Sequence, residues 1–106
     1  MEYVLIFQLP GCSTKDFDEL IELEDAVIDC IGALGIVDGH DRGSGERNIF
    51  IFTDQPESAY RCVRPVFGSK KHVMTDLKVA YQKAEGWEYT ILYPPGLQDF
   101  TVVGDE

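Results

Sequence analysis

The sequence predicts a small α+β domain, and two observations carry that prediction. Short runs of branched and aromatic residues recur along the chain, each bounded by Pro, Gly or Asp, as is typical of strands. Two longer stretches between them repeat apolar residues at helical spacing. At 106 residues the chain has room for one domain over residues 1–106, and hydrophobic residues at 44% suffice for a packed core.

The first strand is predicted at residues 3–10, YVLIFQLP, which a Pro-Gly pair closes. A helix is predicted over residues 16–34, because apolar side chains recur there at intervals of three and four. Ser13 is a suitable N-cap residue, and Asp16 follows three residues later, where a carboxylate favours a helix start.

Two strands are predicted at residues 36–41 and 47–53, joined as a hairpin. Because side chains alternate between the faces of a strand, the hairpin has two different surfaces. One surface is aliphatic and suited to packing under helices; it holds Val37, Gly39, Ile49 and Ile51. The other mixes apolar and polar side chains; it holds Ile36, Asp38, His40, Asn48, Phe50 and Phe52.

The loop of this hairpin is predicted from charge. A three-residue loop at 43–45 pairs Arg42 with Glu46 and Asp41 with Arg47, and both pairs are opposite in charge. Two-residue loops would instead place like charges opposite each other, which is destabilising. We therefore predict the three-residue loop, with its last glycine in the left-handed conformation.

The second half of the chain predicts one more helix and at least two more strands. The helix begins near Pro56, where a missing N–H costs nothing, and Pro65 is expected to kink or split it. Strands are predicted at 76–84 and 85–95. The residues around 100–103 either add a short edge strand or lie loose.

The predicted order is β-α-β-β-α-β with an extra β element. This order is typical of ferredoxin-like folds, in which an antiparallel sheet carries both helices on one face. The mixed surface of the hairpin would then be the face that no helix covers. Aromatic residues of the later strands could add to it: Tyr81, Trp87, Tyr89 and Tyr93. An uncovered aromatic face usually marks a dimer interface or a binding site. The candidate binding residues are Asp38, His40, Asp41, Asn48, Phe50 and Phe52.

Asp38 and His40 also permit a catalytic interpretation. Two residues apart on one strand, they would point the same way, and the carboxylate could orient the imidazole as a general base. The competing reading is that they stabilise the end of the hairpin by hydrogen bonds. Neither a metal site nor a cofactor is predicted, because a third ligand with suitable spacing is lacking.

Composition limits the partners and the compartment. Nineteen acidic residues against nine basic ones give a net charge of −10. That charge repels nucleic acid and anionic membrane, and favours solubility or a basic partner protein. Three cysteines without CxxC spacing indicate reduced thiols, and the sequence predicts neither a signal peptide nor a membrane span. We expect a cytoplasmic protein.

The stretch VDGHDRGSGERNIFIFTD resembles a motif, VDGHDxGxGxxNIFI, of short uncharacterised bacterial proteins. The resemblance implies a compact bacterial α+β domain and points to the acidic, glycine, histidine and asparagine residues of the motif. LIFQLP and NIFIFTD also look like the aromatic strands of RNA-recognition motifs. That weaker resemblance implies shared sheet topology and not RNA binding.

The functional prediction is a non-catalytic binding module that uses the uncovered face of its sheet. The face would bind a second copy or a basic partner, and a small acidic protein also suits an immunity or antitoxin role. The alternative is a small ligand-binding protein or enzyme with an Asp-His site at the end of the hairpin.

Overall fold

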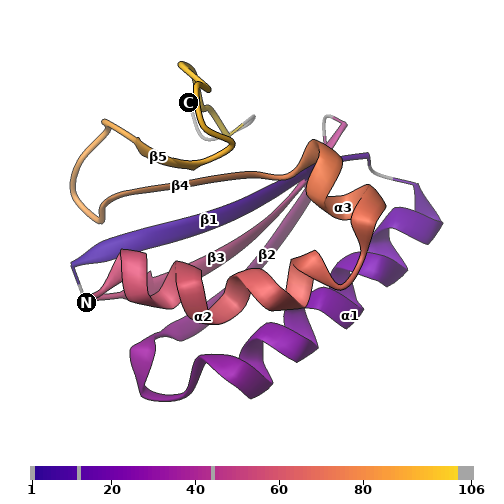
Figure 1. Cartoon of the computed structure of the whole chain (residues 1–106), viewed down its shortest axis with the longest axis horizontal. Helices are drawn as coiled ribbons and strands as arrows, with labels where there is room; N and C mark the ends of the chain where they lie inside the picture. The colour runs from indigo at the N-terminus through magenta and orange to yellow at the C-terminus, as the bar shows by residue number, and fades with distance from the viewer. Residues whose placement is uncertain (1, 12, 44, 103–106) are drawn as a thin grey trace.

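In the computed structural model, residues 2–11, 13–43 and 45–102 are described, and they form a five-stranded antiparallel sheet with three α-helices (Figure 1). In chain order the elements are β1 (Tyr3–Pro10), α1 (Thr14–Ile31), a 3-10 turn (Gly32–Leu34), β2 (Ile36–Gly43), β3 (Glu46–Thr53), α2 (Pro56–Gly68), α3 (Lys71–Asp76), β4 (Lys78–Lys83) and β5 (Thr90–Tyr93).

The sheet order is β2-β3-β1-β4-β5, and every neighbouring pair is antiparallel. The first strand of the chain is therefore the centre of the sheet. Helices α1 and α2 lie side by side on one face, which we call the helix face (Figure 1). The α+β class and the antiparallel sheet are confirmed.

Helix α1 begins as predicted, within two residues. The Ser13 hydroxyl accepts a hydrogen bond from the Asp16 N–H (3.1 Å), and the Asp16 carboxylate accepts one from the Ser13 N–H (3.1 Å). This reciprocal pair satisfies two N–H groups that the first turn would otherwise leave free. The Ser13 hydroxyl also donates to the Asp16 carboxylate (2.8 Å), and this bond, together with that from the Ser13 N–H, holds the pKa of Asp16 below its usual range.

Helix α2 starts at Pro56 as predicted, and it is not split by Pro65. That proline lies three residues before the helix ends at Gly68, so few backbone hydrogen bonds remain to be disturbed. The short helix α3 was not predicted. Its buried Val73 extends the core beyond the end of α2.

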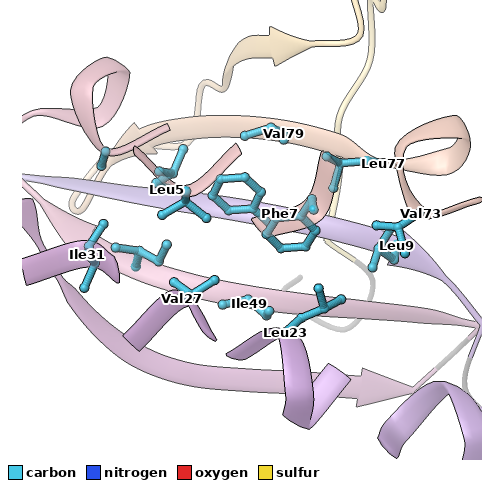
Figure 2. Packing of buried hydrophobic residues seen from close by; sticks show 14 of the residues in the cluster. Leu5, Phe7, Leu9, Leu23, Val27, Ile31, Ile49, Val73, Leu77 and Val79 are labelled. Carbon is cyan, nitrogen blue, oxygen red and sulfur yellow. The ribbon is translucent and has the colours of Figure 1, made fainter. Parts of the chain in front are cut away.

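The helix face of the sheet carries the main core. Alternate residues of β1 point into it, and Phe7 stacks on Phe67 of α2 with ring centroids 4.7 Å apart. Figure 2 shows Leu5, Phe7 and Leu9 on the side of the sheet where Leu23, Val27 and Ile31 of α1 pack. This alternation follows from the geometry of a strand, in which successive side chains point to opposite faces of the sheet.

The opposite face, here called the tail face, is covered in part by residues 97–102. Phe100 and Val102 are buried there and form a second cluster with Ile6 and Ala80. Figure 1 shows this segment on the side of the sheet away from α1 and α2. The expected edge strand or loose tail was wrong: the segment crosses the sheet surface instead of extending its edge.

Three parts of the predictions lie outside the described residues: the thiol of Cys12, the centre of the hairpin loop at Ser44, and Val103 with the residues after it.

Candidate functional site

A β-bulge at Asp38 decides where the predicted site residues point. Val37 pairs with Ile51 but Gly39 pairs with Phe50, so Asp38 is the extra residue. A bulge of one residue reverses the alternation of all side chains that follow it. Gly39 has φ +140°, a conformation that glycine adopts without strain.

His40 consequently lies on the helix face, and its predicted place beside Phe50 and Phe52 was wrong. Its Nδ1 lies 3.0 Å from a carboxylate oxygen of Glu24, and its ring meets Phe17 edge-on at 5.7 Å between centroids. These contacts tie β2 to α1. The expected Asp38–His40 pair on one face is not formed, because the bulge separates the directions of the two side chains.

Asn48 lies on the tail face as predicted, but it is fully buried. Its amide nitrogen donates to Glu46 (3.0 Å), and its amide oxygen accepts from Gln8 (3.0 Å). The Gln8 amide also donates to Glu46 (3.1 Å) and to the backbone oxygen of Thr101 (2.9 Å). Gln8 thereby joins the sheet to the covering segment, a role that the sequence analysis missed.

The predicted three-residue loop register was wrong. Arg42 pairs with Arg47, and Gly43 pairs with Glu46. The like-charged pair is tolerated because the buried Arg47 side chain finds its own partners. It donates to the Pro10 oxygen (2.9 and 3.2 Å), the Asp16 oxygen (3.0 Å) and the Glu19 carboxylate (3.0 Å).

Arg47 lines a cavity of about 320 Å³ between the ends of β1 and α1. Its guanidinium is committed to four hydrogen bonds, and Glu19 is shared with Lys70 at 3.8 Å. The four bonds of Arg47 join β3 to β1 and α1. We interpret this cavity as a structural junction.

The remaining tail face presents an apolar strip that we call the outer patch: Ile36, Phe52 and Phe50. Ile36 is 60% exposed, and it pairs with Phe52 across the β2–β3 ladder. Both phenylalanines are half-buried, and Phe50 also packs against the cluster beneath the tail. Next to Phe50, the place where Gly39 would carry a Cβ is open space. Asp38 and Asp41, at the bulge and further along β2, are exposed.

The later aromatic residues divide between the faces. Tyr81 and Tyr93 pack against the main core on the helix face, which corrects their expected placement, whereas Tyr89 packs against Phe100 on the tail face. Trp87 is 86% exposed in the β4–β5 connection and borders a hollow of about 640 Å³. The walls of this hollow mix aromatic rings with Lys83 and acidic side chains, without a nucleophile–base pair.

Within the described residues, no group of three or more His, Cys, Asp or Glu side chains is placed to hold a metal ion. Their buried side-chain polar atoms all have hydrogen-bond partners. None of the helices in the described part of the chain is long and apolar enough to cross a membrane.

The geometry defines a small α+β protein with a half-covered sheet. Comparison with protein-family models, curated proteins and solved structures finds no match for this chain. The resemblance through VDGHDRGSGERNIFIFTD therefore stays a prediction. Within this motif, the residues have different local roles: a bulge at Asp38, a helix contact at His40 and a buried amide at Asn48.

Proposed function

We propose that this chain is a non-catalytic binding protein, that its contact surface is the outer patch, and that its partner is a protein with an apolar centre and a basic rim. The observation that carries the proposal is the 60% exposure of Ile36 on a sheet row next to Phe52. The tail covers Ile6 and Ala80 but leaves this row uncovered. Exposed apolar strips rimmed by polar residues are typical of interaction sites.

The charge around the outer patch indicates what kind of partner would bind there. The exposed carboxylates of Asp38 and Asp41 border the patch, and the whole chain carries a net charge of −10. Two copies meeting through this surface would bring like charges together, whereas a basic surface would be attracted and steered to it. An immunity or antitoxin role, in which an acidic protein covers a basic toxin, would be one instance of such binding.

The contacts of His40 place it outside the proposed contact surface. Its Nδ1 contacts Glu24 and its ring meets Phe17 on the helix face, away from the outer patch. In the proposed function His40 positions β2 and does not meet the partner.

A ferredoxin-like arrangement is our proposal for the first four strands. The order β2-β3-β1-β4 and the helices that follow β1 and β3 support it, while β5 and α3 are additions. In that arrangement one sheet face remains free of helices, which is the face that carries the outer patch.

The test compares three proteins: the wild type, Ile36→Glu, and the control Ile28→Glu. Ile28 is 51% exposed on α1, so the control adds the same charge at a similar exposure but away from the tail face. Each protein is immobilised and exposed to an extract of the source cells, and captured proteins are identified by mass spectrometry. We expect one basic protein retained by the wild type and by Ile28→Glu, with about tenfold or greater loss for Ile36→Glu.

Salt and solution mass sharpen the test. The captured protein should dissociate more readily at about 1 M salt, where the screening length falls to about 3 Å. Light-scattering chromatography of the wild type should give a monomer. Equal capture by Ile36→Glu would refute the outer patch as the contact surface. A wild-type dimer that Ile36→Glu dissociates would show that the partner is a second copy of the chain and not a basic protein.

A further inference from the structure

Cys30 and Cys62 meet where α1 packs on α2. The Cys62 thiol donates a hydrogen bond to the Cys30 backbone oxygen (3.2 Å), and the Cys30 thiol lies 3.9 Å from the Cys62 backbone oxygen, to which it donates in turn. Both cysteines are free thiols, and both are half-buried. The reciprocal contacts show that the two residues face each other across the helix interface.

This placement suits a covalent link. A disulfide needs two cysteines whose side chains point at each other and whose Cα atoms lie within about 7 Å. Because both residues are half-buried and not sealed in the core, a small reagent can reach the pair from solvent.

We propose that Cys30 and Cys62 form a reversible thiol–disulfide site whose co-reactant is a low-molecular-weight disulfide such as oxidised glutathione. In the first step a thiolate of the pair attacks one sulfur of the reagent, forms a mixed disulfide and releases one glutathione thiolate. In the second step the other cysteine attacks the protein sulfur of that mixed disulfide and releases the second glutathione. The protein loses two protons and two electrons, and one oxidised glutathione becomes two reduced molecules.

The thiolate is the reacting form, so the rate should depend on pH. Burial and the neighbouring Cys62 thiol raise the pKa of Cys30. Exchange is therefore expected to be slow near neutral pH and to accelerate as the solution becomes alkaline. A slow reaction distinguishes this site from the activated cysteines of dedicated oxidoreductases.

The link would close a loop from residue 30 to residue 62 that contains β2 and β3. Closing a loop of this length restricts the unfolded chain, and we expect the Tm of the oxidised protein to rise by roughly 10 °C. The outer patch lies on the opposite face of the same two strands, so oxidation should leave that surface in place.

The experiment uses the full chain with Cys12→Ser, so that only Cys30 and Cys62 can react. The protein is incubated with oxidised glutathione at mildly alkaline pH, the reaction is stopped with acid, and the intact mass is measured. The expected product is a monomer lighter by about 2 Da, which returns to the starting mass with dithiothreitol. The matched variants, Cys30→Ser and Cys62→Ser in the same background, should instead gain one glutathione of about 305 Da.

Other products would overturn the proposal. Two retained glutathiones on the Cys12→Ser protein would show that the cysteines do not resolve each other's mixed disulfides. A covalent dimer would show that they react between molecules. An unchanged mass, with both thiols still alkylated after denaturation, would show that the pair is inert. Should a serine variant fail to fold, the mass of the Cys12→Ser protein still decides between these results.

Discussion

The two faces of the sheet are closed by different means. On the helix face, α1, α2 and α3 cover a continuous apolar cluster that runs from Leu5 to Val79. On the tail face, one segment without regular structure covers Ile6 and Ala80 and is joined to β1 by the Gln8 amide. One face is covered by helices, and the other is covered only in part, mainly by Phe100 and Val102.

This difference explains where an interaction surface can form. A strand buried on both faces has no surface to offer, and β1 is in that position at Ile6. Ile36 of β2 and Phe52 of β3 lie outside the covered part of the sheet, where Ile36 is 60% exposed and Phe52 is half-buried. Partial coverage of a sheet thus creates a defined apolar site beside a stable core.

The largest loss of stability should come from a substitution in the core on the helix face. Phe67 is fully buried and stacked on Phe7, so Phe67→Ala removes a ring and leaves a cavity. We expect a loss of about 4 kcal/mol in the free energy of unfolding, measured by urea titration. The half-buried neighbour Val66→Ala is the control, with an expected loss of about 1 kcal/mol. Equal losses for the two variants would contradict the assignment of this face as the main core.

A smaller effect is expected from the tail face. Phe100→Ala should lower the free energy of unfolding by about 2 kcal/mol, since the residue is buried but belongs to a small peripheral cluster. An apolar fluorescent dye should bind the variant more strongly than the wild type, because Ile6 and Ala80 become accessible. Phe52→Ala, on the same face but uncovered, should change the stability less. A Phe100→Ala protein as stable as the wild type would show that residues 97–102 do not seal the sheet.

The hydrogen bonds of Asn48 beneath residues 97–102 should contribute less still to the free energy of unfolding. Asn48→Ala removes one donor to Glu46 and one acceptor of Gln8 in a buried position, and we expect a loss of about 1–2 kcal/mol. Asp41→Ala, at the exposed cross-strand partner of Asn48, should stay within about 0.5 kcal/mol of the wild type. Hydrogen exchange of the Val102 amide, if faster in Asn48→Ala alone, would place the effect at the covering segment.

The smallest expected effect on stability is one that disappears in acid. Hydrogen bonds from the Ser13 hydroxyl and the Ser13 N–H lower the pKa of Asp16 below its usual range. A carboxyl group whose folded pKa is depressed stabilises the protein above its unfolded pKa, and this contribution is lost as the pH falls through the folded value. Asp16→Asn should therefore differ from the wild type at neutral pH and converge with it in strong acid. Urea midpoints measured along that pH series, with Asp18→Asn as control, would refute the assignment if the difference stayed constant.

Much of the architecture could be predicted because local signals and tertiary structure agree. Ser13 and Asp16 marked the start of α1, and the run of branched and aromatic residues in YVLIFQLP marked a strand. The reversal at Asp38 could not be found from alternation alone, because a bulge is a departure from it. Gly39 was the available signal: a glycine within a predicted strand often marks a bulge.

The other errors have a common physical cause in contacts that are distant in sequence. Cross-strand charge pairing predicted the wrong hairpin register, because the partners of Arg47 are Pro10 and Glu19, far from the hairpin along the chain. The covering role of Phe100 likewise depends on Ile6, at the other end of the sequence. Pairwise rules for neighbouring strands do not contain these interactions.

The central position of β1 has a consequence for synthesis of the chain. β1 is made first, but its two neighbours are β3 and β4, and the second of these ends only at Lys83. An emerging chain therefore carries the apolar run Leu5–Leu9 without strand partners until the hairpin is complete, and without its cover until Val102 has been added. A growing chain of this topology exposes its first apolar strand before its partners are made, and the sheet is expected to close only once β4 and the segment up to Val102 have been added.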